Sequence, residues 1–219
     1  ILMGWNISPE TYVGKIPITI EDILNKKYNI EELKTKNYVL TGPGCLYDKK
    51  IIGFLSELME EQFNQRTAYK DKMLELKKLY EVTKDEKLKN EITKYDNYQY
   101  GKKIQLNSAY GAIANAFFLF YSRENAEAVT YTGQVVIRWA EIKLNEFLND
   151  YFETTNVDYV IASDTDSLYV DLGLFVTRSK LTDKTEIINA LDKFSDEVIT
   201  KKFKEFFDDL IQDMNCPRN

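Results

Sequence analysis

Residues 157–171 read Val-Asp-Tyr-Val-Ile-Ala-Ser-Asp-Thr-Asp-Ser-Leu-Tyr-Val-Asp, and the predicted elements of the chain are arranged around this segment. Its first apolar run contains the β-branched pair Val160 and Ile161, and its second apolar run is residues 168–170. Five short polar residues with turn character, 163–167, separate the two runs. The pattern predicts two antiparallel strands joined by a tight turn.

The predicted turn carries two carboxylates, Asp164 and Asp166. A turn at the end of a hairpin is rigid, so it would hold both side chains at one edge of a sheet. Two close carboxylates repel each other, and a hard divalent cation between them relieves that repulsion. The segment therefore indicates a candidate cation site, although the same five residues also suit an ordinary solvated turn.

Composition excludes several classes of function. The chain has 219 residues and no histidine, which argues against zinc sites and histidine-based acid–base chemistry. It has no apolar run of membrane length, and its two cysteines, Cys45 and Cys216, lie far apart. We therefore expect a globular chain of one large or two small domains, no membrane partner, and a reducing, cytoplasmic setting.

Helical periodicity is strongest from residue 53 to residue 115. Apolar residues recur at helical spacing up to Val82, and Thr83-Lys84-Asp85-Glu86 matches a capping box that would start a second helix. Two long helices joined by a short turn predict an antiparallel helical arm. The net charge of −6 argues against a nucleic-acid binder, but this segment holds 11 basic and 10 acidic residues and is the least acidic part of the chain.

The other segments predict a mixed body around this arm. We expect a chain reversal at 6–11 in which Ser8 caps a short helix, an extended segment at 16–20, and short helices at 19–27 and 30–36. A strand, a turn and a strand follow at 38–47. The apolar run 117–121 predicts core, a helix starts near Ser122, and an amphipathic helix covers 184–214 in one or two pieces. This order predicts an α+β fold with the arm inserted into the body.

Two groups of arm residues have side chains suited to a nucleotide. Lys103, Asn107, Tyr110 and Gly111 share one helix face, which offers a cation, an amide, an aromatic ring and bare backbone. Arg66 and Lys70 also project together and would gain from an anion between them. The alternative interpretation is a helix with solvated cations and a packed tyrosine.

Together, Lys103-x-x-x-Asn107-Ser108-x-Tyr110-Gly111 and Asp164-Thr165-Asp166-Ser167 resemble the motifs of family B DNA polymerases. Residues 6–11, 63–66 with Lys70, and 123–126 are similar to the T-even-type bacteriophage branch. The resemblance covers nearly the whole chain in the right order. The family usually has Tyr-Gly before Asp-Thr-Asp, whereas this chain has Ala162-Ser163, and we expect only a small shift of the turn from that difference.

This resemblance implies a polymerase palm at residues 1–52 and 116–219, built on an antiparallel sheet backed by helices, with helical-hairpin fingers at 53–115. It implies two-metal nucleotidyl transfer from a dNTP to a primer 3′ hydroxyl, with two Mg²⁺ ions that Mn²⁺ can replace. Asp166 and Asp164 would be the catalytic and metal-binding carboxylates. The resemblance further implies that the incoming triphosphate is bound by Arg66, Lys70, Lys103 and Asn107. It implies that the nascent base pair lies on Ile104, Ser108, Tyr110 and Gly111.

The resemblance also implies partners and missing parts. The partners would be primer-template DNA, dNTPs and a sliding clamp, in the cytoplasm of a phage-infected bacterial host. The family's aspartate motif, Asp-x-x-Ser-Leu-Tyr-Pro-Ser, would precede Ile1, and the exonuclease and thumb are not in this sequence, so we expect the isolated chain to be inactive. One alternative is a catalytically silent piece that binds nucleotide or partner chains and works only when complemented. Another is an unrelated helical-hairpin interaction protein.

Overall fold

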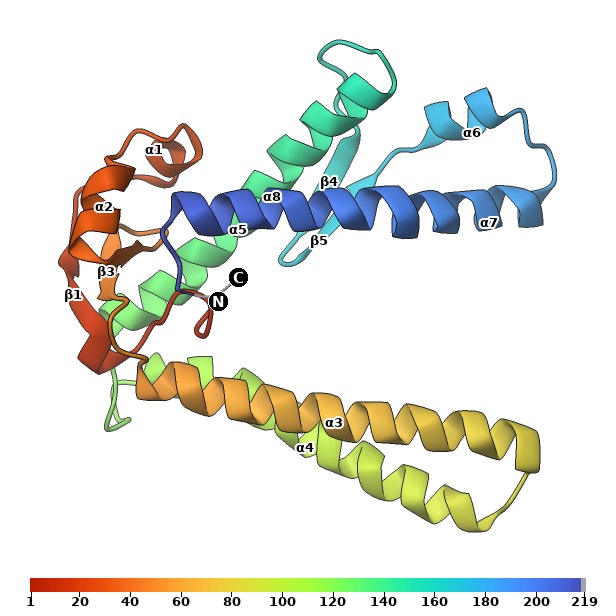
Figure 1. Ribbon diagram of the computed structural model, residues 1–219, viewed down its shortest axis with the longest axis horizontal. Coiled ribbons are helices and arrows are strands. Elements are labelled where there is room, and N and C mark those ends of the chain that lie inside the picture. Colours follow the sequence, from red (N-terminus) through yellow and green to blue (C-terminus); the bar gives the residue numbers. More distant parts are fainter. Residues whose placement is uncertain (218–219) are drawn as a thin grey trace.

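The computed structural model describes residues 1–217 and arranges them as a body with a projecting arm (Figure 1). The body contains two small antiparallel sheets covered by helices, and the arm is a pair of long helices inserted between two halves of the body. The expected α+β class with an inserted helical hairpin is confirmed. No helix within residues 1–217 has the length and apolar character that a bilayer span requires.

The first sheet lies in the N-terminal half of the body and has the strand order β1–β3–β2. Strands β2 (Tyr38–Leu40) and β3 (Cys45–Asp48) form the predicted strand–turn–strand, and helices α1 (Ile20–Leu24) and α2 (Ile30–Lys36) confirm the two predicted short helices. Strand β1 is Tyr12–Lys15, earlier than the extended segment predicted at 16–20. Pro17 has no N–H to donate, so regular pairing ends before it.

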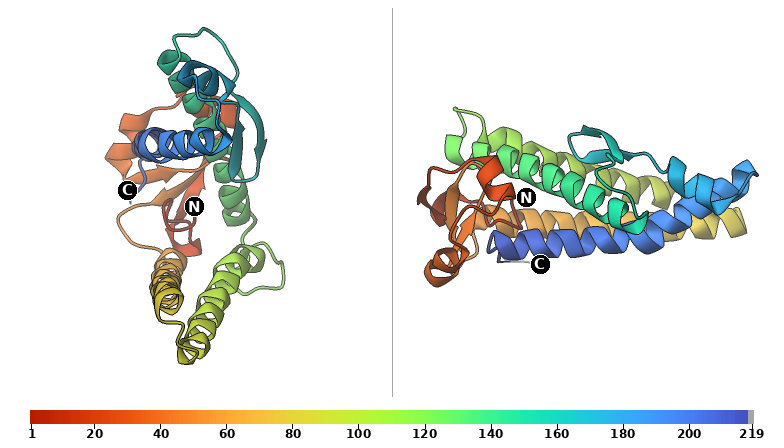
Figure 2. Two further views of the ribbon diagram at one scale, coloured as in Figure 1. Left: turned by 90° about the vertical axis from the view of Figure 1, so that its right-hand side faces the viewer. Right: turned by 90° about the horizontal axis from the view of Figure 1, so that it is seen from above.

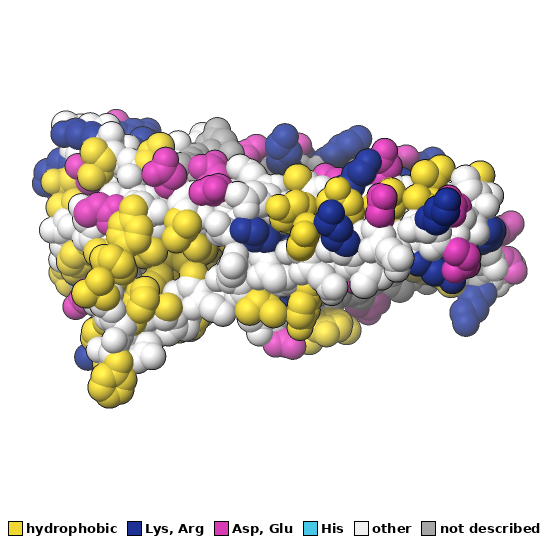
Figure 3. Space-filling model, turned by 90° about the horizontal axis from the view of Figure 1, so that it is seen from below, with side chains coloured by type: hydrophobic (Ala, Val, Ile, Leu, Met, Phe, Trp, Pro, Cys, Tyr) yellow, Lys and Arg dark blue, Asp and Glu magenta, His cyan; other side chains and the backbone are white. Residues whose placement is uncertain are grey.

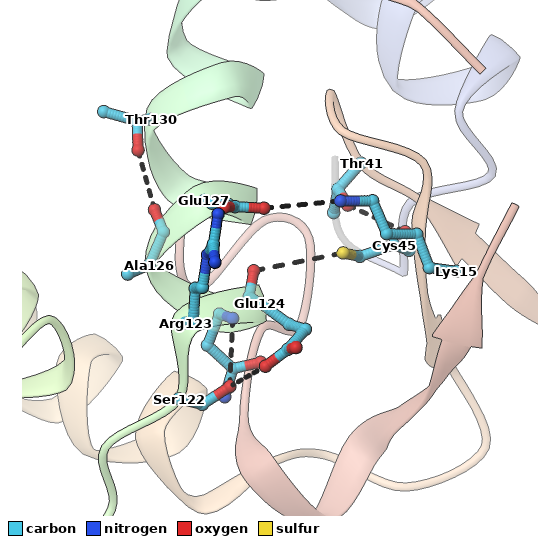
Figure 4. A network of polar contacts seen from close by, with 10 residues as sticks. Lys15, Thr41, Cys45, Ser122, Arg123, Glu124, Ala126, Glu127 and Thr130 are labelled. Carbon is cyan, nitrogen blue, oxygen red and sulfur yellow. Dashed lines mark hydrogen bonds and ion pairs between the residues drawn. The ribbon is translucent and has the colours of Figure 1, made fainter. Parts of the chain in front are cut away.

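Helix α5 (Arg123–Tyr151) is the central element of the body because both hydrophobic cores pack against it. Ser122 caps this helix as predicted, since its hydroxyl accepts a first-turn N–H at 3.1 Å. Figure 4 shows how the first turns of α5 are tied to the first sheet: Glu127 pairs with Lys15 at 3.3 Å and with Arg123 at 2.8 Å. One end of α5 therefore holds the first sheet, and the other end supports the second.

The second sheet is the predicted hairpin, formed by β4 (Val160–Asp164) and β5 (Ser167–Val170). It packs on α5 through a core that includes buried Leu144, Leu148 and Val160. Helices α6 (Gly173–Ser179), α7 (Lys184–Phe194) and α8 (Thr200–Asp213) follow. A π-helical turn, Ser195–Ile199, joins α7 and α8 into one rod, and α8 packs across α5 (Figures 1 and 2). The predicted helix at 184–214 is therefore present in two α-helical pieces.

The arm consists of α3 (Phe54–Thr83) and α4 (Lys87–Ile113), which leave the body together (Figures 1 and 2). The capping box predicted at 83–86 is wrong. Thr83 is the last residue of α3, and its hydroxyl donates to the carbonyl of Leu79 at 2.9 Å. Lys84 ends α3 in the left-handed conformation, and Asp85 accepts the N–H of Lys87 at 3.0 Å. The motif failed because a threonine in a last helical turn bonds backward to its own helix.

The aromatic run 117–121 is largely exposed, so our prediction that it is core was wrong. Phe117 is 99% exposed and Leu119 is 85% exposed. Phe120 instead turns toward the arm, where its ring lies 5.0 Å from the ring of Phe54. Successive residues of a turn point to different sides, and only one side of this turn meets α3. Figure 3 shows apolar side chains gathered at the end of the molecule where the arm joins the body.

Candidate functional site

The β4–β5 turn is shorter and more tightly bonded than the sequence predicted. Ser163 and Asp164 lie in β4, and only Thr165 and Asp166 form the loop. Thr165 has a φ of 51°, and the Asp166 N–H donates to the Asp164 carbonyl at 2.6 Å. The Ser167 hydroxyl donates to the same carbonyl at 3.0 Å. The loop is therefore held by two hydrogen bonds to the Asp164 carbonyl, one from backbone and one from a side chain.

The two carboxylates of this turn have different surroundings. Asp164 lies opposite Ser167 in the ladder, and its Oδ1 accepts the Thr165 hydroxyl at 3.0 Å. Asp166 lines a cavity of about 440 Å³ whose other walls are mostly apolar side chains of α5, β5 and α8, including Leu168 and Phe203. Both aspartates are exposed. Asp166 is therefore the aspartate of this turn that borders the cavity, and Asp164 lies beside it.

The donor set at the turn fits one weakly held hard cation. Mg²⁺ commonly keeps several waters and takes one or two carboxylates together with substrate phosphates, so two exposed aspartates suit it. Among residues 1–217 there is no cluster of three or more acidic, cysteine or histidine side chains placed to enclose a metal. The described part of the chain therefore offers a carboxylate pair and not a closed metal site.

The α4 residues predicted to share a face are exposed at the base of the arm. Asn107 and Tyr110 line a cavity of about 340 Å³ together with Ile1, Leu2 and Met3. A Cβ atom at Gly111 would meet nothing within 4 Å, so this glycine is not required for packing inside the chain. The helix face predicted from spacing is therefore present, and its backbone is open at one point.

Ser108 and Ile104 lie differently from this face. Ser108 lines a cavity of about 440 Å³ between α3 and α4, whose walls include Met59 and Gln62. Ile104 is 50% exposed. Two of the four residues predicted to form the floor of a nascent base pair therefore line different cavities, Tyr110 the one beside residues 1–3 and Ser108 the one between α3 and α4.

The α3 cations lie at the same level of the arm as Lys103. Lys102 donates to Gln62 at 2.6 Å, and the Tyr69 and Tyr98 rings are 5.3 Å apart. In α3, Arg66 lies between Gln62 and Tyr69, and the partners of these two residues in α4, Lys102 and Tyr98, are close to Lys103. Arg66 is therefore within about two helical turns of Lys103 along the arm. Lys70 follows Arg66 by four residues and shares its face.

The predicted triphosphate cations lack partners within the described residues. Arg66, Lys70 and Lys103 form no ion pair with any of residues 1–217, whereas nearby Lys72 pairs with Glu75 at 2.9 Å. The Nε atom of Arg66 is buried and has no hydrogen-bond partner there. A buried guanidinium nitrogen without a partner is costly, so an acceptor from outside the described residues would relieve it. These three cations are thus available to an anion.

The two groups of residues are on separate parts that face each other. The β4–β5 hairpin points its turn toward the side of the body from which the arm extends (Figure 1). The cavity at Asp166 and the cavity at Asn107 share no lining residue. The arrangement can place a cation at the turn and an anionic group against the arm.

The sequence matches the family model described as DNA polymerase family B over residues 1–210. The chain belongs to DNA polymerase family B. It is similar to the DNA-directed DNA polymerase of Escherichia phage RB69, with 27% identity over 260 residues that cover 98% of this chain and 28% of that protein. It is also similar to the DNA-directed DNA polymerase of Enterobacteria phage T4, with 29% identity over 250 residues, 95% of this chain and 27% of that protein.

A third relative matches a shorter stretch of the chain. DNA polymerase 2 of Aeropyrum pernix is 29% identical over 170 residues, which cover 78% of this chain and 17% of that protein. The family B chain described here therefore spans less than a third of the length of these relatives.

Proposed function

We propose that this chain is the palm and fingers portion of a DNA-directed DNA polymerase that transfers nucleotides from dNTPs to a primer 3′ hydroxyl. The palm would be residues 1–52 and 116–219, of which the last two lie outside the described residues, and the fingers would be the arm, residues 53–115. The observation that carries the proposal is an exposed Asp-Thr-Asp turn on a hairpin facing an arm on which Arg66, Lys70 and Lys103 form no ion pair within the described residues. The family of the chain supports it.

The proposed roles follow from the surroundings of each residue. Asp166 would hold the catalytic cations, and Asp164 would support it from the adjacent ladder position. Two bound Mg²⁺ ions, or Mn²⁺ in their place, would supply activation of the hydroxyl and stabilisation of charge on the phosphates. Arg66, Lys70 and Lys103 would hold the triphosphate, and Asn107 would donate to a sugar or phosphate oxygen.

The nascent base pair would lie over the α4 face. Tyr110 would pack against a base, and the open backbone at Gly111 would let the template strand approach closely. Ile104 and Ser108 would complete this floor. Ser108 also borders the cavity between α3 and α4, and Ile104 is half exposed.

The proposed partners are primer-template DNA, dNTPs and the polymerase portions that the relatives contain and this sequence does not, with a sliding clamp as a further partner. Two of the matched relatives are phage proteins, so we expect this chain to act in the cytoplasm of an infected bacterium. The competing proposal is a silent piece that binds nucleotide and needs a complementing chain for chemistry. Unpaired cations on the arm are compatible with both.

Removing one arm cation should impair nucleotide use. In a polymerase reconstituted from this chain and the portions found in its relatives, Lys103→Ala and Arg66→Ala should each raise the apparent KM for dNTP by roughly 10- to 100-fold. Each loses a charge-assisted contact worth roughly 1.5–3 kcal/mol. Steady-state primer extension measures this effect. Lys89→Ala is the matched control because Lys89 pairs with Glu86 at the tip of the arm. Unchanged KM values in both variants would show that the arm does not bind the triphosphate.

Gly111→Ala should stabilise the fold and at the same time impair primer extension. Alanine is the better helix former by about 0.8–1.0 kcal/mol, and the new Cβ meets nothing, so the free energy of unfolding should rise. Primer extension should fall by roughly tenfold or more, because the methyl group would meet the template strand. Gly101→Ala is the matched control, since Gly101 lies in the same helix and is equally open. Equal activity of the Gly111→Ala and Gly101→Ala variants would show that the template strand does not approach this face of α4.

A further inference from the structure

Helix α3 begins without a cap of its own. Its N-cap residue is Gly53, which has no side chain to accept the free N–H groups of the first turn. Three residues from the start of the chain serve instead. Asn6 Oδ1 accepts the N–H of Gly53 at 2.8 Å, Glu10 Oε1 accepts that of Phe54 at 2.5 Å, and Ser8 Oγ accepts that of Leu55 at 3.4 Å.

The donors of the same turn hold the segment that leads into the arm. Asn6 Nδ2 donates to the carbonyls of Asp48 and Ile51, each at 2.8 Å, so one side chain fixes both the end of β3 and the linker to α3. Asn6 is 2% exposed, and Ser8 is fully buried. A Cβ atom at Gly53 would lie 2.4 Å from the Cβ of Ser8, which shows how closely the two backbones approach. This contact needs glycine at position 53.

Charge adds to the hydrogen bonding. The Ser8 hydroxyl donates to Glu10 Oε2 at 2.5 Å, so the carboxylate is held against the positive end of the α3 dipole. Desolvation alone would raise the pKa of Glu10, but the hydrogen bonds from Ser8 and from the Phe54 N–H outweigh it and lower the pKa below its usual value. The turn is itself braced, because the Thr11 hydroxyl lies 2.7 Å from the Asn6 carbonyl oxygen and 3.0 Å from that of Ser8.

We infer that Asn6, Ser8 and Glu10 are positioning residues that cap α3 from the body and set the direction in which the arm leaves it. The second attachment, at the far end of α4, is mostly apolar, with buried Ile113 and the contact of Phe120 with Phe54. Its one directed contact across the junction with α5 in the described residues is the Ser122 N–H, which donates to the Ile113 carbonyl at 3.3 Å. Apolar contacts tolerate sliding more readily than three directed hydrogen bonds do. The turn at 6–11 therefore fixes the angle of the arm.

The length of α3 makes this angle important. Arg66 lies about 18 Å along the helix from Phe54 at a rise of about 1.5 Å per residue, so a tilt of about 10° at the base moves it by about 3 Å. A displacement of about 1 Å can cost roughly 100-fold in catalysis. Asn6 and Glu10 would thus affect the arm cations without touching any nucleotide.

The test measures the arm directly in the full chain. Spin labels are attached at Lys78→Cys on α3 and Lys204→Cys on α8, both exposed, while Cys45 and Cys216 are buried. Pulsed dipolar spectroscopy then gives the distance distribution. Wild type should give one narrow distribution, and Asn6→Ala and Glu10→Ala should each broaden or shift it. Glu10→Gln keeps the acceptor oxygen facing Phe54 but loses the charge and the acceptor of the Ser8 hydroxyl, so its distribution should lie between those of wild type and Glu10→Ala.

The matched control is Asn29→Ala, because Asn29 also caps a helix, but locally: its side chain accepts the N–H of Glu32 in α2. Amide hydrogen exchange gives a second readout. Exchange at Gly53, Phe54 and Leu55 should accelerate about five- to tenfold in Asn6→Ala, with the middle of α4 unchanged. If Asn6→Ala does not fold, Glu10→Ala and Ser8→Ala answer the same question.

Distributions and exchange rates in Asn6→Ala and Glu10→Ala that match those of Asn29→Ala would overturn the inference. This outcome is distinguishable from a failure of the proposed function, since neither readout depends on polymerase activity. If the arm moves but reconstituted primer extension keeps its KM for dNTP, the positioning inference holds and the triphosphate role of the arm fails.

Discussion

Asp166→Ala should reduce templated primer extension by the reconstituted polymerase by roughly 1,000-fold or more. Asp166 occupies the two-residue loop between β4 and β5 and is the turn carboxylate that lines a cavity. Under the proposed function it is the ligand that the catalytic cations share, and removing such a group costs several kcal/mol of transition-state stabilisation. Rapid-quench primer extension at saturating dNTP measures the loss.

Three further variants are compared with Asp166→Ala to test this prediction. Asp166→Asn keeps size and polarity but removes the charge, and its activity should fall nearly as far as that of Asp166→Ala. Asp164→Ala should lose less, because Asp164 lies beside the cavity and not in its wall. Asp192→Ala removes the same charge from an exposed site on α7 and should leave activity unchanged.

A metal titration of the isolated chain tests the same assignment without activity. Mn²⁺ should bind weakly to wild type, more weakly to Asp164→Ala and not at all to Asp166→Ala, as followed by the magnetic resonance signal of the free ion. Identical Mn²⁺ titration curves for wild type and Asp166→Ala would remove Asp166 from the metal site.

The sequence predicted the elements that depend on local pattern. The β4–β5 hairpin follows from two apolar runs around five polar residues, and the arm follows from long helical periodicity. Asp164 and Asp166 could be placed together because they are two residues apart on one turn. Their different surroundings could not be predicted, since the cavity wall at Asp166 comes from α5 and α8, which are distant in sequence.

The predictions that were wrong share a physical cause, because the same local sequence pattern is compatible with more than one structure. Ser8 was expected to cap the short helix that follows it, yet its hydroxyl accepts the N–H of Leu55 in α3. Thr83 belongs to the end of α3 and not to the start of α4. Phe117 has the composition of a core residue, but its turn has a neighbour on only one side. Each of these outcomes depends on which element packs next to the residue.

The other large effect concerns what the chain can do by itself. Residues 1–219 alone should show templated extension at least roughly 1,000-fold below that of the reconstituted polymerase. Two-metal transfer needs cations about 4 Å apart, held so that the attacking and leaving oxygens are in line. The described residues offer Asp164 at the end of β4 and Asp166 in the loop, and no group of three or more acidic, cysteine or histidine side chains placed to hold a metal. A pair can recruit a cation but cannot fix two, and positioning supplies most of the catalysis in phosphoryl transfer.

Nucleotide binding and chemistry should therefore separate. The arm cations belong to α3 and α4, which are complete, so a dNTP should bind the isolated chain and binding should weaken in Lys103→Ala. Adding a polypeptide that ends in Asp-x-x-Ser-Leu-Tyr-Pro-Ser, together with a thumb, should restore templated extension. The same polypeptide with its aspartate replaced by alanine is the control and should restore none.

Extension by residues 1–219 alone that matches the reconstituted rate, and that is lost in Asp166→Ala, would contradict this prediction. Some other carboxylate of the chain would then have to complete the site. Asp158 and Asp171 are on the same hairpin but at its opposite end, where Asp158 accepts a hydrogen bond from Asn145 and Asp171 accepts the N–H of Gly173. At about 3.3 Å per residue, Val160 at the start of β4 lies about 13 Å from Asp164, and Asp158 lies beyond that end of the strand. Neither can reach a cation at the turn while the hairpin is intact, so the completing carboxylate would have to come from outside β4 and β5.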